Sequence, residues 1–297
     1  MCLPPRRHRL AAVPELAIAD CHRHLGHLPP QRFYGMDEPM VPAAASKGNV
    51  RDLLTQLDEE GTERALIIPN YGVSDPDVSF ALNEVVLEAA STDERLSCGL
   101  WVSPRPQDTE RTEAALALAG ERGVRALKLS FLLGGAPDDP ACEPQLKRIF
   151  EVAAAHDLVV HIHTSPGAAS DIDKVGHLIE VYGDATKIHL VHLGGGVSGH
   201  IKLVGGRFFD WIERGKRVYT DASWAIGFAP RWLAAEIERR GAGHDRILFA
   251  SDEPWSDRPG ELARMRAAMG DGELGRCVFH ENYAALYDPP RRNENGS

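Results

Sequence analysis

The feature of this sequence that most constrains the fold is an alternation of short apolar runs with longer helical patterns. Eight runs are short and rich in aliphatic and β-branched residues, which is typical of buried strands. They occupy residues 16–22, 64–69, 96–103, 124–131, 158–163, 187–192, 217–223 and 246–252. The segments between them place apolar residues at helical spacing, and several begin with Asp, Asn or Pro and end near Gly. These helices are expected over 49–60, 77–91, 108–122, 143–155, 171–182, 201–214, 230–240 and 259–269.

A strand followed by a helix, repeated eight times, predicts parallel strands joined by helical crossovers. This pattern favours a closed α/β barrel, the (β/α)8 TIM barrel, in a single domain, and leaves an open doubly wound sheet as the alternative. We expect the barrel to cover residues 16–288. An N-terminal lead-in is expected over 1–15 and a disordered tail over 289–297. A long Pro/Gly-rich loop over 25–48 and a last helix near 273–287 complete the prediction.

Composition excludes several classes of partner. The formal net charge of −10, from 33 basic and 43 acidic residues, argues against nucleic acid or an anionic membrane. No apolar stretch is long enough for a membrane span, and no apolar segment follows the basic N-terminus as a signal peptide requires. The five cysteines are odd in number and form no CxxC pair. A disulfide framework is therefore not expected, and a cytoplasmic location is.

The first strand concentrates polar residues in an alternating pattern. Because alternate residues of a strand face the same side, Asp20, His22 and His24 are expected on one face. Cys21 and Arg23 are then expected on the other face, with Cys21 packed against helices. The sequence His-x-His therefore predicts two imidazoles pointing the same way.

Three further strands end in His or Asp. His163 ends the fifth strand, His192 the sixth and Asp252 the eighth. The alternation rule places His161 one layer below His163 on the same face, and His189 on the face opposite to His192. The C-terminal ends of barrel strands meet at one rim, where barrel active sites form. We therefore expect these side chains to converge there.

This set of donors matches the coordination preferences of a divalent metal. Imidazole nitrogens from His22, His24 and His163, with a carboxylate oxygen from Asp252, suit zinc, manganese or iron. A catalytic site of this kind leaves a position open for water, whose pKa a bound metal lowers to about 7. The sequence thus predicts a metal-dependent enzyme.

Four motifs occur in order at the first, fifth, sixth and eighth predicted strands: DCHRHLG, IHTSPG, VHLGGG and FASDEPW. With the closing segment ENYAALYD, they resemble the amidohydrolase superfamily, and within it the amidohydrolase-2 branch of aminocarboxymuconate-semialdehyde decarboxylase-like enzymes. The resemblance covers roughly residues 16–288. It implies that the four residues named above are metal ligands, and it favours one ion over two, with zinc preferred and manganese as the alternative.

The resemblance also implies roles for three residues. Asp252 would take a proton from metal-bound water, and His192 would activate water or steady charge on the substrate. Lys128, expected to face the interior, lies where two-metal relatives carry a carboxylated lysine. Its alternatives are a bridging role, contact with substrate, or an ion pair with a neighbouring carboxylate.

Hydrolysis is the leading functional hypothesis: attack of metal-activated water on an amide, lactone or related carbonyl of a small molecule. The alternative is a lyase, a non-oxidative decarboxylase or hydratase acting on an aromatic or unsaturated acid with the same metal site. A non-catalytic metal-binding barrel is a third hypothesis. The substrate is expected to be small, carboxylate-bearing or cyclic, and the resemblance suggests a homodimer. Candidates for binding a substrate carboxylate are Arg23, Arg32, Arg207 and Arg231.

Smaller features around the strand ends also yield predictions. Asp221 and Ser223 are expected to line the mouth or to cap the seventh strand, and Trp224 to help wall the pocket, as do Trp255 and Phe131. Gly194–Gly196 has no following Lys-Ser/Thr, so it favours a close approach between backbones over a phosphate cradle.

Overall fold

The structure, a computed structural model, describes residues 16–27, 48–70 and 76–288. Within them, eight parallel strands form one sheet in sequence order. The strands are β1 (Ile18–Leu25), β2 (Thr62–Pro69), β3 (Leu96–Val102), β4 (Val124–Leu129), β5 (Val159–Ile162), β6 (Lys187–Leu190), β7 (Val218–Asp221) and β8 (Ile247–Leu248). All eight predicted strands are confirmed, and each lies within or beside its predicted apolar run.

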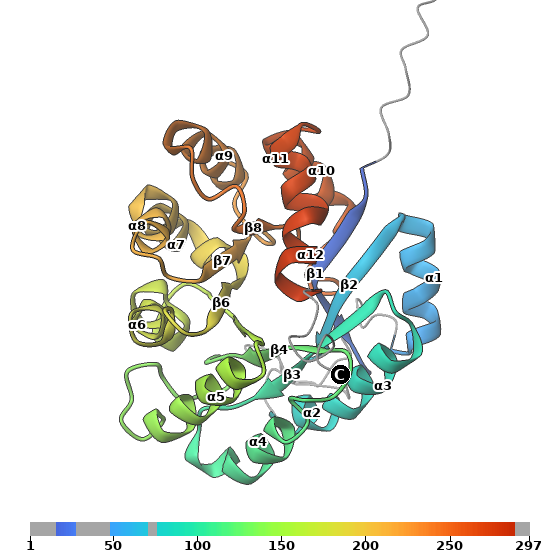
Figure 1. The fold of residues 1–297 in the computed structure, drawn as a ribbon, viewed down its shortest axis with the longest axis vertical. Coiled ribbons are helices and arrows are strands. Elements are labelled where there is room, and N and C mark those ends of the chain that lie inside the picture. The colour runs from blue at the N-terminus through green and yellow to red at the C-terminus, as the bar shows by residue number, and fades with distance from the viewer. Residues whose placement is uncertain (1–15, 28–47, 71–75, 289–297) are drawn as a thin grey trace, which may run out of the picture.

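The sheet closes on itself (Figure 1). The chain after β8 bonds to β1: Cys21 N–H donates to the Phe249 carbonyl oxygen at 3.0 Å, and Asp252 N–H to the His22 carbonyl oxygen at 2.8 Å. These bonds complete a (β/α)8 TIM barrel in a single domain, which confirms the predicted fold class. The predicted lead-in, tail and most of the 25–48 loop lie outside the described residues.

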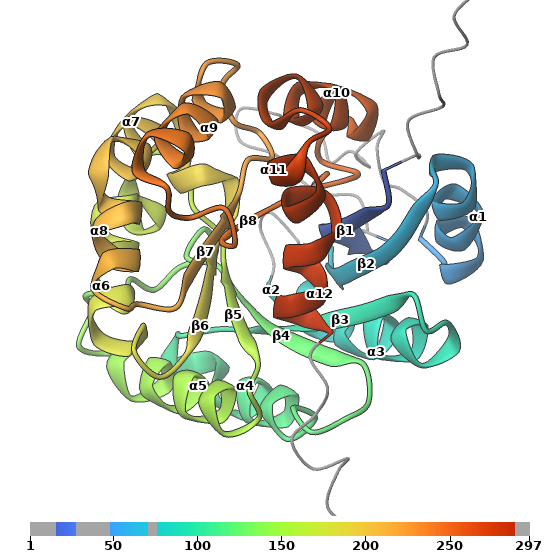
Figure 2. The same ribbon diagram turned by 45° about the horizontal axis from the view of Figure 1, so that its top comes forward.

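Helices surround the barrel (Figure 2). They are α1 (Val50–Glu60), α2 (Pro76–Ala81), α3 (Asn83–Thr92), α4 (Thr109–Leu116), α5 (Glu143–Ala155), α6 (Ile172–Tyr182), α7 (Gly196–Lys202), α8 (Phe208–Glu213), α9 (Ala229–Arg240), α10 (Arg258–Met269), α11 (Glu273–Arg276) and α12 (Asn282–Tyr287). Three predicted helices are interrupted: 77–91 divides into α2 and α3, and 201–214 and 273–287 each contain a π-helical turn. No helix in the described ranges is long and apolar enough to cross a membrane.

The inside of the barrel has its own apolar cluster. Small and branched side chains of the strands, such as Ala126, Val159 and Leu248, pack against Tyr283 and Tyr287 of α12. The last helix therefore covers the N-terminal end of the barrel, which is why the chain needs it after the eighth unit. The opposite, C-terminal end of the strands carries the polar residues.

Candidate active site

A β-bulge in β1 sets the direction of its side chains. Asp20 and Arg23 pair with positions of β2 only two residues apart, so β1 carries one extra residue between them. Cys21 therefore lies in the interior cluster, and His22 and His24 both reach the cavity side. The predicted His-x-His orientation is confirmed. The faces predicted for Asp20 and Cys21 are wrong, because the bulge breaks the alternation; Asp20 instead accepts a hydrogen bond from Ser251 N–H at 2.9 Å.

A row of interior side chains crosses the neighbouring strands. Trp101, Lys128, His161 and His189 occupy adjacent register positions on β3 to β6. Side chains paired in this way face the same side of a sheet. His189 thus faces the interior, and the prediction that it lies opposite the site is wrong. The interior position of Lys128 is confirmed.

His192 reaches the site by a turn and not by strand alternation. β6 ends at Leu190, and His192 follows in a short turn with φ 66° and ψ 30°. Leu193, Trp224 and Asp252 also have positive φ, so four of the six described non-glycine residues of this kind follow β6, β7 and β8. Such conformations cost free energy and concentrate at functional sites. The strand ends therefore carry backbone strain where the polar residues gather.

The glycine run after β6 allows two backbones to touch. Gly195 has φ +72°, and a Cβ atom there would lie 2.5 Å from Ser165 Cα. The predicted close approach is confirmed, and it holds the loop that carries His192 against the end of β5.

A small cavity lies at the C-terminal ends of the strands. Its lining residues are His24, Trp101, Lys128, Ser130, His163, His192 and Asp252. Its volume of about 10 Å³ is the space that one water molecule or one ion takes up. Five of the seven were predicted site residues. Trp101 was missed, although its register with Lys128 on the neighbouring strand would have indicated it.

Three donor atoms converge beside this cavity. His22 Nε2 lies 3.2 Å from His24 Nε2, and Asp252 Oδ1 lies 3.0 Å from the first and 3.1 Å from the second. His24 Nδ1 lies 2.9 Å from the Pro69 carbonyl oxygen. A carbonyl accepts only, so Nδ1 carries a proton and Nε2 is the nitrogen left to bind a metal. A carbonyl that fixes a ring in this way is the usual outer partner of a metal-binding histidine.

Lone pairs that face one another at this distance repel unless a cation lies between them. Ligands bound at about 2.1 Å lie about 3.0 Å apart at right angles and about 3.4 Å apart at a tetrahedral angle, and the observed spacing falls in this range. Burial, and secondarily Lys128, lower the pKa of His22 well below its ordinary value. A shared proton is therefore a poor way to offset the repulsion between the facing lone pairs of His22 and His24. His22, His24 and Asp252 therefore fit a divalent metal by chemistry and by spacing.

His163 and His192 lie at the edge of this group. Their ring centroids are 5.0 Å apart, and burial lowers the pKa of both, so both are neutral. His192 Nε2 lies 3.9 Å from Asp252 Oδ2. His163 lines the cavity but is not among the described atoms that all lie within 4.8 Å of one another. The structure thus brings three of the four predicted ligands into mutual contact and the fourth into the same cavity.

Lys128 lies beneath the three donors. Its Nζ is 3.3 Å from His22 Nε2 and 3.2 Å from His161 Nδ1, and burial lowers its pKa to about 8. Both of these neighbours are imidazoles, not carboxylates. Lys128 places a positive charge at the cavity, which none of the predicted arginines within the described residues does. Of these, Arg23 pairs with Glu60 and Glu253 away from the cavity.

The other arginines and the aromatic residues predicted near the site lie in different parts of the structure. Arg207 pairs with Asp173 on the outer face, Arg231 lines an outer groove, and Arg32 lies outside the described residues. Trp224 Nε1 donates to Asp252 Oδ2 at 2.6 Å, so it lies beside the cavity, although it is not among the residues that line it. Phe131, in contrast, is buried in the outer core.

Cys21, His189 and Asp221 form a second group of close donors deeper in the barrel. His189 Nε2 donates to Asp221 Oδ2 at 3.0 Å, and its Nδ1 lies 2.6 Å from the Tyr287 hydroxyl oxygen. Burial raises the pKa of the Cys21 thiol well above its ordinary value, which disfavours the thiolate that binds metals. His189 and Asp221 already have partners, so this group is structural.

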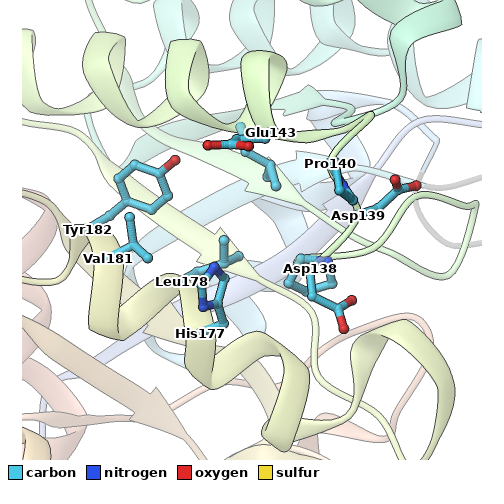
Figure 3. A pocket seen from close by; sticks show the side chains of 10 residues that line it. Asp138, Asp139, Pro140, Glu143, His177, Leu178, Val181 and Tyr182 are labelled. Carbon is cyan, nitrogen blue, oxygen red and sulfur yellow. The ribbon is translucent and has the colours of Figure 1, made fainter.

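A larger cavity of about 270 Å³ lies on the outer surface (Figure 3). Residues of α5, α6 and the segment before α5 line it, among them Asp138, Glu143, His177 and Tyr182. It lies outside the barrel, away from the strand ends, and Asp138 is neutralised by Lys174 at 2.6 Å. The convergent donors are found at the smaller cavity, which is therefore the candidate site.

Several solved structures share this fold. The 5-carboxyvanillate decarboxylase from Sphingomonas paucimobilis matches with a TM-score of 0.67 and 16% identity, over 93% of this chain and 100% of that one. The same enzyme from Novosphingobium aromaticivorans, complexed with manganese and 4-hydroxy-3-methoxy-5-nitrobenzoic acid, gives 0.64 and 17%, over 93% and 97%. A probable 2-pyrone-4,6-dicarboxylic acid hydrolase from Acinetobacter baumannii with citric acid bound gives 0.60 and 12%, over 92% and 99%.

No curated protein sequence matches the chain significantly. The family model described as Amidohydrolase, of the amidohydrolase-2 branch, matches residues 19–288. That range holds the barrel and every residue of the candidate site. The chain therefore belongs to the amidohydrolase family, as the four motifs at its strand ends indicated.

Proposed function

We propose that this protein is a divalent-metal-dependent enzyme that decarboxylates a small aromatic or unsaturated carboxylic acid. The observation that carries the proposal is the convergence of His22 Nε2, His24 Nε2 and Asp252 Oδ1 to within 3.2 Å of one another. His163, which lines the same cavity, completes the proposed ligand set. The size of the cavity favours one ion over two.

Either zinc or manganese suits imidazole and carboxylate donors. Manganese is the stronger candidate because a structural neighbour from Novosphingobium aromaticivorans is complexed with it. When bound, the metal supplies positive charge that binds and polarises an oxygen of the substrate. The chain's own residues then orient the acid and move its proton.

Decarboxylation breaks the bond between a carbon and its carboxylate. The electron pair of that bond stays on the carbon, which takes up a proton while carbon dioxide leaves. Lys128 offers positive charge to a substrate oxygen, and the mostly apolar Trp101 side chain lies beside it. Asp252, whose Oδ2 accepts from Trp224, would pass a proton to the carbon, and His192, whose Nε2 lies 3.9 Å away, would take up a proton from water at Nε2 and hand it on to Asp252.

The resemblance to decarboxylases supports this reading over the hydrolysis that the sequence placed first. Two of the three structures compared above are named for the decarboxylation of an aromatic acid. Hydrolysis stays as a second candidate for a specific reason: a neutral His192 with a free Nε2 lone pair is the base that attack by water requires. One further relative is named as a probable hydrolase.

The test is a substrate panel with the manganese- and zinc-loaded protein. The panel contains hydroxybenzoic acids and carboxylated phenols on one side, and lactones of dicarboxylic acids on the other. Release of carbon dioxide from an aromatic acid, measured by mass spectrometry and lost in Asp252→Asn, is the expected result. Lactone opening without carbon dioxide would replace decarboxylation by hydrolysis, and no turnover across the panel with either metal would overturn the proposed substrate class.

A further inference from the structure

A buried carboxylate lies behind His192. Asp221, at the end of β7, is fully buried, and its Oδ1 accepts from Ser223 N–H at 2.9 Å and from the Ser223 hydroxyl at 2.5 Å. His192 N–H also donates to Oδ1, at 3.3 Å. Burial alone would raise the pKa of Asp221, but its hydrogen bonds, first that from His189, hold the pKa below its ordinary value. Asp221 is therefore ionised and can only accept hydrogen bonds.

The direction of each bond beyond Asp221 follows from this. The Ser223 hydroxyl has a single hydrogen, and the 2.5 Å contact directs it to Asp221. Its Oγ can then only accept from His192 Nδ1, which lies 2.8 Å away. The Ser223 carbonyl oxygen, 3.2 Å from the same nitrogen, is a second acceptor. Both partners of Nδ1 accept, so Nδ1 bears the proton.

The hydrogen bonds on the other side of Asp221 also run toward this carboxylate. His189 Nε2 donates to Asp221 Oδ2, and its Nδ1 accepts from the Tyr287 hydroxyl. Donors thus converge on one carboxylate from both directions, from α12 at the bottom of the barrel and from His192 at its mouth. Each member of the chain has its orientation fixed by the next.

We propose that Ser223 and Asp221 are positioning residues that hold His192 in the tautomer with its proton on Nδ1. The lone pair of Nε2 then always faces the cavity and Asp252. The tautomer follows from the hydrogen bonds alone, whereas its value for catalysis rests on the proposed function. When Nε2 takes a proton, the negative charge of Asp221, passed on through Ser223, stabilises the resulting imidazolium.

The other tautomer would be unproductive. A proton on Nε2 would leave Nδ1 with a lone pair between two acceptors, which is a buried repulsion. It would also remove the acceptor that can exchange a proton with Asp252. A histidine held in the wrong tautomer by loss of its carboxylate partner is known to lose most of its activity as a base.

The test uses nitrogen NMR of the full-length protein labelled with ¹⁵N-histidine, with His192 assigned by difference from His192→Gln. The expected wild-type spectrum shows a protonated Nδ1 and an unprotonated Nε2. Ser223→Ala should give a mixture of tautomers and a kcat lowered by about 10-fold to 100-fold, with KM nearly unchanged. Ser223→Thr, which keeps the hydroxyl, should restore both readouts.

Ser97→Ala is the matched control. It removes an equally buried hydroxyl that lies 2.8 Å from the hydroxyl of Tyr283, on the same helix as Tyr287. It should change neither the His192 signals nor kcat. A wild-type His192 protonated on Nε2, an unchanged spectrum in Ser223→Ala, or an equal effect of Ser97→Ala would overturn the proposal. The spectrum is readable without a substrate, so its result is separate from failure of the proposed reaction.

Discussion

Two pairs of histidines inside the barrel differ in what their ring nitrogens face. The upper pair, His22 and His24, directs both Nε2 atoms at Asp252 beside the cavity. The lower pair, His161 and His189, lies one layer deeper, where Lys128 and the partners of His189 engage the rings. Burial lowers the pKa of both His22 and His161, so burial and low pKa do not mark a ligand. The upper pair differs because both of its Nε2 atoms meet at one oxygen of one carboxylate.

The largest effect is expected at the carboxylate that distinguishes the pairs. Asp252→Asn should lower kcat by about 100-fold or more, because the amide cannot transfer the proton and is a weaker ligand. Thermal unfolding should still show a folded barrel. Steady-state kinetics on the substrate found by the panel measures the loss. A near-normal rate would remove Asp252 from the mechanism.

Lys128→Met probes the charge that lies between the two pairs. The thioether replaces the stem of the lysine without its ammonium, so KM for an anionic substrate should rise about 10-fold, which corresponds to about 1.4 kcal/mol. The free energy of unfolding should not fall, because a buried ammonium is costly. Metal content is the control. If the wild type binds two ions and Lys128→Met binds one, Lys128 has the bridging role instead.

His189→Ala tests the structural role of the lower pair. It leaves the buried Tyr287 hydroxyl and Asp221 Oδ2 each without a partner, so the free energy of unfolding should fall by about 2–4 kcal/mol. Metal content should not change. Urea unfolding measures the free energy of unfolding, and metal analysis measures the bound ion. A variant that loses its metal but keeps its stability would contradict a structural role for His189.

The smallest effect is expected outside the barrel. His177 is exposed and lines the outer cavity in Figure 3. His177→Ala should change the free energy of unfolding by no more than about 0.5 kcal/mol and kcat by less than about twofold. A larger loss of activity would mean that the outer cavity takes part in function.

The sequence predicts the barrel and most of the candidate site because both depend on periodic patterns. Apolar runs define the strands, and His163, Lys128 and Asp252 lie where strand alternation puts them. Alternation fails where the backbone departs from a regular strand. The bulge in β1 turns Cys21 inward, and the left-handed turn after β6 brings His192 to the cavity.

Contacts between distant segments were also beyond the sequence. The Pro69 carbonyl that sets the tautomer of His24, and the bond between His189 and Tyr287, join residues 45 and 98 positions apart. No local pattern encodes such pairs, because they arise only when the barrel closes and α12 covers its end. Trp101 is different: alternation applied to the third strand would have found it.

We expect the upper pair, and not the lower, to hold a metal. The most direct measurement is the metal content of the purified protein by plasma mass spectrometry, for the wild type, His24→Ala and His161→Ala. We expect about one equivalent of manganese or zinc in the wild type and in His161→Ala, and almost none in His24→Ala. Two results would contradict this: a wild type that binds neither manganese nor zinc after dialysis against each ion, or an equal loss of metal in the two variants.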